Sequence, residues 1–503
     1  MNPLFKPSDA TQIVRRISRA GADLSFFSDL AFEAGVVARS LGDYLAGGGL
    51  RLGVTGLSRS GKTVFLTALI SNLLAGVRLP VLAASAEGRI TRARLEPQPN
   101  DAVPRFAYEA HLASLSGPER CWPQSTRRIA QLRLTIEFES AARWNGGSGS
   151  LSLDLVDYPG EWLLDLPLLS KSYATWANET LTAAGSPARA PLSADWRAAL
   201  AGLDPHAEAD EDRAREIADK FTAYLRKARQ NVYALSTLPP GRFLMPGDLE
   251  GSPALTFAPV PIGGEEAIVP GTMAAMMDRR YEAYKTHVVK PFFRDHICRL
   301  DRQIVLVDAL TALNSGPAAV RDLENALSEV LGAFRAGRSS ALASIFRPRI
   351  DKILFAATKA DHLHHTSHDR LEAILRALTA KAMARAEGVG AEIDVIALSA
   401  IRATRQAELR QNGEVLNAIV GVPEKGETIG GETFDGVAEA AVFPGELPED
   451  PAEIFEGDAI ALPEADNDWR FVRFRPPAAQ RGLPAPHIRL DRALQFLIGD
   501  RLT

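Results

Sequence analysis

The chain contains 503 residues, which is too long for one compact domain and indicates two or three structural units. Its net charge of −5 argues against a general nucleic-acid binder, because such proteins carry a basic excess. Its two cysteines, Cys121 and Cys298, are far apart in the sequence, which excludes a disulfide framework and favours a reducing compartment.

Membrane insertion is not expected from the sequence. No segment has the roughly 20 continuous apolar residues that span a bilayer, and the N-terminus lacks the apolar core of a secretory signal. We therefore expect a cytoplasmic protein. The first predicted element is a helical arm at 1–48, which carries Arg15 and Arg19 near Phe27. Weak peripheral contact of this arm with the inner membrane and packing of the arm on the core are both compatible with that composition.

The next predicted elements belong to a sheet. A buried strand at 50–55 is followed by a glycine-bounded turn and a helix. An irregular stretch occupies 78–128. Two strand-like runs at 129–138 and 151–156 are then joined through an Asn-Gly-Gly turn signal at 145–147. Strands joined by such a short connection must pair in antiparallel fashion.

The second half of the chain alternates between strands and helices after a long helical stretch. Buried strand patterns and helical patterns follow one another at 304–307, 318–335, 353–356, 369–387 and 393–398. This alternation predicts an α/β fold with a mostly parallel sheet. Residues 421–470 differ in composition, because they hold fourteen acidic residues against two basic ones. The predicted parts are the arm (1–48), the core (49–160 and 301–402), a helical insertion (161–300), an acidic β-rich or irregular insertion (403–480) and a terminal helix that returns to the core (481–503).

A phosphate-binding motif follows the first core strand. The segment from Gly56 to Thr63 (GLSRSGKT) matches G-x-x-x-x-G-K-[ST], and its glycines allow successive N–H groups to point at a phosphate. Lys62 is predicted to bridge the β- and γ-phosphates, and Thr63 to offer its hydroxyl to Mg²⁺. The predicted nucleotide contacts in this loop are Gly56, Ser58, Arg59, Ser60, Gly61, Lys62, Thr63 and Val64.

A second motif, Asp157-Tyr158-Pro159-Gly160, closes the strand at 151–156. The carboxylate of Asp157, at the end of a buried strand, is predicted to hold Mg²⁺ through water. The backbone N–H of Gly160 is predicted to approach the γ-phosphate. Asp154, earlier in the same strand, is expected to be structural.

The base is predicted to be read by two later loops. Thr358-Lys359-Ala360-Asp361 follows a strand and fits the pattern [NT]-K-x-D. One carboxylate, that of Asp361, accepts hydrogen bonds from N1–H and N2–H₂ of guanine, whereas adenine offers no such pair of donors. Lys359 is predicted to cover the base with its aliphatic stem. Thr358 replaces the more common Asn, which weakens the case for strict guanine selection. The segment Ser399-Ala400-Ile401 is predicted to meet guanine O6 with a backbone N–H.

Catalytic residues are harder to predict. Thr126 is the candidate switch threonine that covers Mg²⁺, because it lies just before the strand at 129–138. Arg127, Arg128 and Arg59 are candidates to neutralise phosphate charge, and solvated surface arginines are an equally good interpretation for 127–128. Glu161 stands where small GTPases carry a water-orienting Gln. A carboxylate is repelled by a triphosphate, so slow turnover that awaits a protein partner or regulator is predicted.

A histidine cluster follows the guanine motif. His362, His364, His365 and His368 have spacing compatible with a metal site, but their position before a helix favours the solvated start of that helix.

Together the motifs predict a P-loop NTPase of the Ras-like plan, with a mostly parallel sheet and one antiparallel strand, that binds GTP or GDP with Mg²⁺. The functional hypothesis is a GTPase. Two alternatives stay open. One is a nucleotide-loaded interaction module that scarcely hydrolyses GTP, which is compatible with Glu161 and the acidic segment. The other is an ATPase, if Thr358 impairs guanine reading.

Six segments also carry a family resemblance: GLSRSGKT (56–63), WPQSTR (122–127), DYPGEW (157–162), RFLMPGDL (242–249), TKADH (358–362) and IRLDRALQFLIGDRL (488–502). With these segments the chain resembles the YcjX-like family of bacterial P-loop proteins over nearly its whole length. The resemblance implies a Ras-like GTPase core with insertions and an association with envelope-stress operons. Members of that family are often described simply as ATPases, and their partners are poorly defined.

Overall fold

The computed structural model describes residues 49–57, 59–98, 103–117, 119–124, 128–141, 147–230, 239–263, 268–333, 350–387, 390–411, 414–429, 431–456, 471–478 and 483–503. The predicted arm at 1–48 lies outside these ranges, and so do three predicted site residues, Ser58, Thr126 and Arg127.

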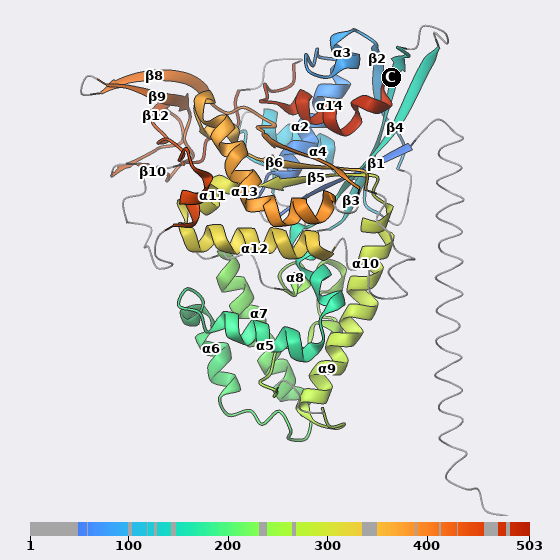
Figure 1. The fold of residues 1–503 in the computed structure, drawn as a ribbon, viewed down its shortest axis with the longest axis vertical. Helices are drawn as coiled ribbons and strands as arrows, with labels where there is room; N and C mark the ends of the chain where they lie inside the picture. Colours follow the sequence, from blue (N-terminus) through green and yellow to red (C-terminus); the bar gives the residue numbers. More distant parts are fainter. Residues whose placement is uncertain are drawn as a thin grey trace, which may run out of the picture.

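One seven-stranded sheet forms the centre of the molecule, in the order β2-β3-β4-β1-β5-β6-β7 (Figure 1). Its strands are β1 (Gly49–Gly56), β2 (Ile90–Leu95), β3 (Ala130–Glu139), β4 (Ser148–Asp157), β5 (Arg302–Val307), β6 (Lys352–Ala357) and β7 (Glu392–Ala397). Strand β3 is antiparallel to both of its neighbours, whereas β4, β1, β5, β6 and β7 are parallel. The predicted α/β class with one antiparallel strand is therefore confirmed.

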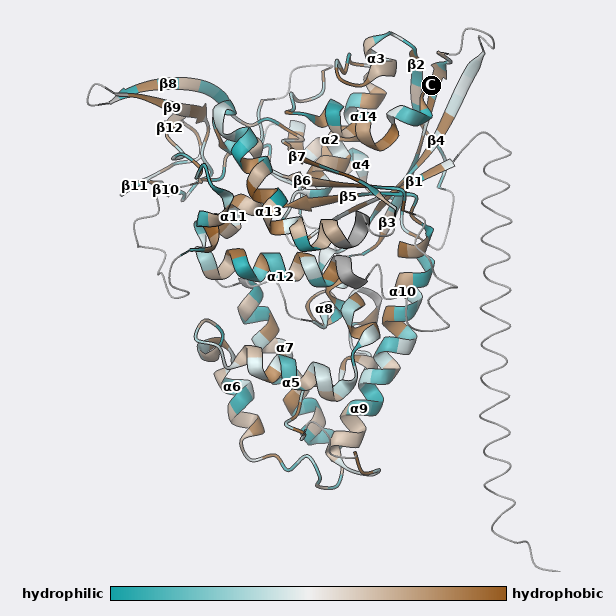
Figure 2. Cartoon of the chain, in the orientation of Figure 1, coloured by the Kyte–Doolittle hydropathy of each residue, from teal (hydrophilic) through white to brown (hydrophobic). Residues whose placement is uncertain are grey.

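The strand sequences explain why this sheet is central. After polar residues at their starts, strands β5 and β6 continue as the apolar runs IVLV and ILFAA, and they are mostly buried, as expected for parallel strands covered on both faces. Figure 2 shows these strands in the colour of hydrophobic residues, while the surrounding helices carry hydrophilic residues as well. Alternate strand residues therefore face two different layers of helices.

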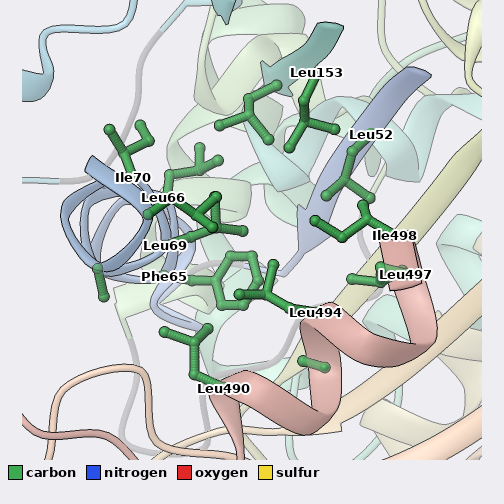
Figure 3. Packing of buried hydrophobic residues seen from close by; sticks show 14 of the residues in the cluster. Leu52, Phe65, Leu66, Leu69, Ile70, Leu153, Leu490, Leu494, Leu497 and Ile498 are labelled. Atoms are coloured by element: carbon green, nitrogen blue, oxygen red, sulfur yellow. The ribbon is translucent and has the colours of Figure 1, made fainter. Parts of the chain in front are cut away.

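One layer contains α2 (Lys62–Leu74), α3 (Ala83–Ala86), α4 (Tyr108–Ser116) and α14 (Leu490–Ile498). Leu490, Leu494 and Leu497 of α14 pack on the side of the sheet that α2 covers, near Phe65 and Leu52 (Figure 3). A helix from the end of the chain thus completes the apolar cover over the first strand.

The opposite layer contains α11 (Ala309–Asn314), α12 (Pro317–Ala333) and α13 (His368–Glu387). Their apolar side chains share a cluster with Val305 of β5 and Phe355 of β6. In the cluster on the other face, Ile304 and Leu354 take the corresponding places. The alternation of neighbours along each strand follows from the two-residue period of side chains in a sheet.

A separate group of helices follows β4 in sequence. Its members are α5 (Tyr173–Ala184), α6 (Ala190–Leu200), α7 (Glu211–Gln230), α8 (Gly241–Leu244), α9 (Met273–Tyr284), the π-helix η4 (Lys285–Val289) and α10 (Lys290–Asp295). They share an aromatic cluster in which Trp176 stacks on Tyr281 with ring centroids 5.0 Å apart, and Trp196 stacks on Tyr224. Figure 1 shows these helices as a lobe beyond α12.

Short 3₁₀ helices connect the longer elements: η1 (Gly160–Ser170), η2 (Gly247–Leu249), η3 (Pro253–Leu255), η5 (Ile297–Arg299), η6 (Ala360–His362), η7 (His365–Ser367), η8 (Pro451–Phe455) and η9 (Gly499–Arg501). The longest of them, η1, leads directly from the Asp157–Gly160 motif into the helical lobe. None of the described helices is long and apolar enough to cross a bilayer.

The acidic region forms small antiparallel sheets. Strands β8 (Arg405–Gln411), β9 (Glu414–Gly421) and β12 (Ala440–Val442) pair in the order β12-β9-β8, and β10 (Thr428–Ile429) pairs with β11 (Glu432–Thr433). In Figure 1 the β8–β9 hairpin projects away from the main sheet. Strand β8 was not predicted, because five of the seven residues in RQAELRQ are polar. Near the end of this region, Phe474 forms an isolated bridge with Pro423.

The stretch at 78–128 is more regular than predicted. It contains α3, the edge strand β2 and the helix α4. Strand β2 was not predicted because its sequence, ITRARL, is charged. The strand lies at the edge of the sheet, and both of its arginines are exposed.

Candidate nucleotide site

The predicted motifs meet at one edge of the main sheet. Strands β4, β1, β5, β6 and β7 are parallel, so the loops that follow them lie together at their carboxyl ends. In open α/β sheets this is the edge at which ligands bind. The sheet therefore brings Gly56–Thr63, the Asp157–Gly160 motif, and the loops at Asp361 and Ser399 to a common side.

Two glycines of the loop between β1 and α2 have the positive φ angles that the predicted phosphate-binding motif requires. Gly56 has φ +152 and Gly61 has φ +86, and a Cβ at Gly56 would lie 2.4 Å from the carbonyl oxygen of Leu306. Arg59 also adopts a positive φ of 64, which is strained for a residue with a Cβ, and its side chain is exposed. Only glycine at 56 therefore fits between β1 and β5.

Three polar side chains of this loop, those of Ser60, Lys62 and Thr63, are buried. The Nζ of Lys62 donates to the carbonyl oxygens of Gly56 at 2.8 Å and of Leu57 at 3.3 Å, and only 8% of Lys62 is exposed. The Oγ of buried Ser60 has no hydrogen-bond partner among the residues that the structure describes. Thr63, in the first turn of α2, is buried too, and the neighbouring Val64 is partly exposed. An inward-facing lysine and a buried hydroxyl oxygen suit an anionic ligand.

The Asp157–Gly160 motif touches this loop. Asp157 pairs with Val54 in the parallel ladder between β4 and β1, and its side chain is buried. A Cβ on Gly160 would lie 1.8 Å from the carbonyl oxygen of Gly56, so the two backbones are in direct contact. Asp154 receives two hydrogen bonds from Arg133, at 2.5 and 2.7 Å, on the neighbouring strand.

The charged groups of Glu161, Asp157 and Arg229 all influence the pKa of Lys62. Burial lowers the pKa of Lys62, the carboxylates of Glu161 and Asp157 oppose this shift, and Arg229 adds to it. A phosphate group beside Lys62 would favour its charged form in the same way as the two carboxylates. The lysine thus lies in a compact cluster of acidic and basic groups.

Glu161 has a partner that the sequence did not reveal. Its carboxylate forms an ion pair with Arg229 of α7 at 2.5 Å, and the side chains of Glu161 and Arg229 are 7% and 27% exposed. The two residues are 68 positions apart in the sequence. The signal available in the sequence was weak: Arg229 is the last basic residue of a long amphipathic helix.

The segment after Glu161 is enclosed by the helical lobe. Trp162 donates through Nε1 to the carbonyl oxygen of Met245 at 2.9 Å, and the guanidinium of Arg242 lies 3.2 Å from the centre of the Trp162 ring. Buried Asp165 accepts hydrogen bonds from the N–H of Gly241 at 2.6 Å and from the hydroxyl of Tyr284 at 2.7 Å. The family segments DYPGEW and RFLMPGDL are therefore one packing unit.

The other end of the site is the loop after β6. Lys359 has a positive φ of 63, and its Nζ contacts the carboxylate of Asp308 at 2.5 Å. Burial raises the pKa of Asp308, but the Lys359 charge and hydrogen bonds from Lys359 and Thr311 outweigh it and lower that pKa. Asp308, which follows β5, was not predicted as a site residue. Thr358 is buried, and its hydroxyl donates to the carbonyl oxygen of Val307 at 3.3 Å.

Asp361 is also held by a distant residue. The Oδ2 of Asp361 accepts a hydrogen bond from the N–H of Ala403 at 2.8 Å, and 3% of Asp361 is exposed. The hydroxyl of Thr404 donates to the carbonyl oxygen of Asp361 at 2.5 Å. The start of the acidic insertion thus orients the carboxylate that is predicted to read the base.

The loop at 399–401 is joined to the end of the chain. Ser399 and Ile488 exchange two backbone hydrogen bonds, of 3.1 Å from Ser399 N and 2.8 Å from Ile488 N. The hydroxyl of Ser399 donates to the carbonyl oxygen of Ile401 at 2.8 Å. Because the N–H of Ser399 is bonded to Ile488, the neighbouring N–H of Ala400 is the better candidate for a ligand contact.

Three of the four histidines are not solvated, which corrects the preferred interpretation for them, whereas His365 is exposed as expected. His362, His364 and His368 are all buried, and the Nε2 of His368 lies 2.9 Å from the carbonyl oxygen of Ala360. Within the described part of the chain, no group of His, Cys, Asp or Glu is placed to hold a metal ion. The ring of His362 instead lies edge-on to that of Phe474, with ring centroids 5.4 Å apart. Arg128, the remaining arginine candidate, is exposed.

Comparison with known proteins gives consistent matches over almost the whole chain. The model of the YcjX-like family, DUF463, matches residues 50–502. A protein of Escherichia coli (strain K12) described as Ras-like GTPase YcjX is 41% identical over 466 residues, which is 90% of this chain and 96% of that protein. A protein of Shewanella oneidensis (strain MR-1) with the same description is 34% identical over 485 residues, covering 90% of this chain and 94% of that protein. Together with the sheet order, these matches confirm the predicted Ras-like fold class and the family resemblance.

Proposed function

Because this chain belongs to the YcjX-like family, we propose that it is a Mg²⁺-dependent GTP-binding protein that slowly hydrolyses GTP to GDP and phosphate. The relatives are described as Ras-like GTPases. One observation carries the proposal. The glycine-bounded loop with buried Lys62 lies at the same edge of the parallel sheet as buried Asp361. The loop suits the phosphate end of a guanine nucleotide, and the aspartate suits its base.

At the phosphate end, backbone N–H groups of the Gly56–Thr63 loop and the ammonium of Lys62 would hold the β- and γ-phosphates. Gly160 would add its N–H, since its backbone already contacts Gly56. Ser60 offers a buried hydroxyl in the same loop. Ser58, which was predicted as a further contact, lies outside the described residues.

The residues near this loop fit a Mg²⁺ ion. Mg²⁺ prefers oxygen ligands, and Thr63 and Asp157 supply a hydroxyl and a carboxylate at the ends of adjacent elements, both buried. When bound, the ion would neutralise charge on the β- and γ-phosphate oxygens. Thr126, the proposed switch ligand, lies outside the described residues.

At the base end, Asp361 would accept the N1–H and N2–H₂ groups of guanine, while Ala403 holds one of its oxygens. Ala400 would donate its N–H to O6, between Ser399 and Ile401. Lys359 would lie along the base, positioned by Asp308. Thr358 lacks the amide of the more common Asn, but its hydroxyl bond to Val307 braces the loop.

Hydrolysis is proposed to be slow. Glu161 follows Gly160 directly, and a carboxylate near a triphosphate is repelled by it, so Glu161 is a poor substitute for a neutral water-orienting residue. A regulatory role in a stress response, with a protein partner that changes turnover, is the biological setting that the family resemblance suggests.

A nucleotide titration tests the proposal. Purified protein with Mg²⁺ and a fluorescent GDP analogue is expected to release the analogue upon addition of GDP or GTP, and to retain it with equal ADP or ATP. Equal displacement by ADP would favour the alternative ATPase function. Lack of binding by either nucleotide would exclude the proposal altogether.

Phosphate release then separates the two guanine-binding alternatives. Multiple-turnover release of phosphate from GTP, at rates well below about one per second, is expected for a slow GTPase, because even GTPases with an arginine in cis turn over at about 0.01 per second. Release indistinguishable from a Lys62→Ala control would instead support a nucleotide-loaded interaction module.

A further inference from the structure

The ion pair between Glu161 and Arg229 places a residue of the helical lobe at the proposed phosphate site. Glu161 directly follows Gly160, whose backbone contacts Gly56 of the phosphate loop. Arg229 lies near the C-terminal end of α7, so α7 directs one guanidinium toward this loop. In Figure 1, α7 runs through the lobe toward the sheet, and α8 lies at the side of the lobe that faces the sheet.

The backbone at Glu161 is supported by Gly241 of α8, which contacts Glu161 directly and is itself bonded to Asp165. Gly241 of α8 is so close that a Cβ there would lie 1.7 Å from the carbonyl oxygen of Glu161. Gly241 is in turn bonded through its N–H to Asp165, four residues after Glu161 in the chain. A carboxylate on such a supported backbone, with 7% of its side chain exposed, can hold Arg229 in a defined place.

Arg229 is close enough to influence the phosphate-binding lysine. Its positive charge lowers the pKa of Lys62, after the larger effects of burial, Glu161 and Asp157. Two basic and two acidic side chains are therefore gathered at the proposed γ-phosphate position. A γ-phosphate would repel Glu161 and attract Arg229, and the planar guanidinium suits bidentate contact with phosphate oxygens.

The other arginine candidates are less well placed. Arg59 and Arg128 are both exposed, whereas Arg229 is 27% exposed and contacts the residue after Gly160. Arg127 lies outside the described residues. The geometry therefore favours Arg229, which belongs to none of the sequence motifs, as the arginine nearest the proposed γ-phosphate position.

We propose that Arg229 is a catalytic arginine supplied by the helical lobe of the same chain: it binds the γ-phosphate of GTP and is positioned for this by Glu161. This rests on the proposed GTPase function. In the reaction, a water oxygen bonds to the γ-phosphorus as the bond from that phosphorus to the bridging oxygen breaks. GDP leaves with the electron pair of the broken bond. One proton of the water passes to an oxygen of the released phosphate, and the other stays on the oxygen that has bonded to phosphorus. Arg229 neutralises negative charge on the γ-phosphate oxygens during this step.

The first experiment compares nucleotides that differ in the third phosphate. The affinities of GDP and of a non-hydrolysable GTP analogue are measured by calorimetry for the full-length wild type, Arg229→Ala and Arg226→Ala. Arg226 is an exposed arginine of the same helix and serves as the matched control. Arg229→Ala is expected to lower affinity for the GTP analogue roughly 10- to 100-fold and to leave GDP affinity nearly unchanged, as for loss of a charged hydrogen bond.

The second experiment measures chemistry. Single-turnover GTP hydrolysis by Arg229→Ala is expected to be at least about 100-fold slower than by the wild type, since an arginine acting on the γ-phosphate has effects of this size or larger. Arg229→Lys is expected to fall between them, and Arg226→Ala to match the wild type.

A double variant separates binding to phosphate from simple neutralisation of Glu161. Glu161→Gln removes the negative charge, so a merely neutralising Arg229 becomes dispensable in that background. We expect Arg229→Ala to reduce affinity for the GTP analogue in the Glu161→Gln protein as well. Equal affinity of Glu161→Gln and the double variant would overturn the inference.

Two further outcomes also count against Arg229. A parallel loss of GDP and GTP-analogue affinity, together with a lower unfolding temperature, would show that Arg229 only fastens the lobe to the core. Unchanged affinities and rates would show that it has no role at the site. Failure of the proposed function is distinct, because the wild type itself would then fail to bind guanine nucleotides.

Discussion

The two ends of the candidate site are built by different means. At the phosphate end, the loop conformation depends on glycines that are close in sequence, and Lys62 donates to Gly56 and Leu57 of its own loop. At the base end, the reading residues are held by distant ones: Lys359 by Asp308, 51 positions earlier, and Asp361 by Ala403, 42 positions later.

The difference predicts two kinds of sensitivity. At the phosphate end, the backbone contacts of Gly56 and Gly160 leave no room for even one extra carbon atom. Substitution of either glycine should therefore abolish most nucleotide affinity rather than reduce it in steps. Side-chain hydrogen bonds at the base end are individually modest, so their loss should reduce affinity or selectivity in steps. The following variants test this contrast.

The largest effect is expected from Gly160→Ala. The new Cβ would lie 1.8 Å from the carbonyl oxygen of Gly56, and a backbone atom cannot move aside easily. We expect GDP affinity to fall by more than about 100-fold, which corresponds to roughly 3 kcal/mol. Gly202→Ala is the matched control, because a Cβ at Gly202 meets no atom within 4 Å. Calorimetric titration with GDP checks both, and wild-type affinity of Gly160→Ala would refute the close backbone contact.

Asp361→Asn is expected to have the next largest effect. The amide retains an oxygen for the N–H of Ala403 but presents donors to the guanine edge, so GDP binding should weaken by about 10- to 100-fold. Binding of xanthosine diphosphate should strengthen, because xanthine offers an oxygen at the position of the guanine amino group. Competition of the two diphosphates against a fluorescent analogue measures the change. An unaltered order of preference would exclude Asp361 from the base contact.

A smaller effect is expected from Asp308→Asn. Asp308 caps α11 through a hydrogen bond from the N–H of Thr311, and Asn caps helices equally well, so the fold should be preserved. The ion pair with Lys359 is lost, and we expect GDP and a GTP analogue to weaken together by roughly tenfold. Calorimetry with both nucleotides checks this. A selective loss of the GTP analogue would contradict a role at the base end.

The last prediction concerns the pH dependence of folding stability rather than nucleotide affinity, and it tests the buried carboxyl of Asp165 behind Glu161. Burial raises the pKa of Asp165 to about 6, although hydrogen bonds from Tyr284 and Gly241 partly oppose the shift. A carboxyl whose pKa is higher in the folded chain holds its proton more tightly when folded. Its stabilising contribution is therefore complete below the unfolded pKa of about 3.9 and is lost as the pH rises through about 6.

Asp165→Asn removes this titration. Its single amide oxygen can still accept the hydrogen bond from the N–H of Gly241, and its NH₂ group can donate to the hydroxyl oxygen of Tyr284. The wild type should lose up to about 3 kcal/mol relative to the variant between about pH 4 and pH 7. Thermal unfolding midpoints of both proteins across that range check the prediction. A constant difference between the two midpoints would show that Asp165 does not titrate there.

Much of the site could be predicted because its signals are local. The glycines at 56 and 61 have the positive φ angles that the motif requires, and the hairpin before Asp157 forms the antiparallel pair. The partners of Glu161, Lys359 and Asp361 could not be predicted, since each lies dozens of residues away and belongs to no motif. The burial of His368 was missed as well. A histidine in the first turn of a helix is often solvated, and only the folded structure shows its Nε2 beside the carbonyl oxygen of Ala360.

The sequence by itself determined the order of the motifs, the alternation of strands and helices, and the chemical character of each loop. These depend on backbone freedom and on side-chain periods of two or 3.6 residues, which are properties of neighbouring positions. Only the tertiary structure decided which charges meet. Arg229 reaches Glu161 because a helical lobe packs against the end of β4, and contacts of that kind arise from packing rather than from any local pattern.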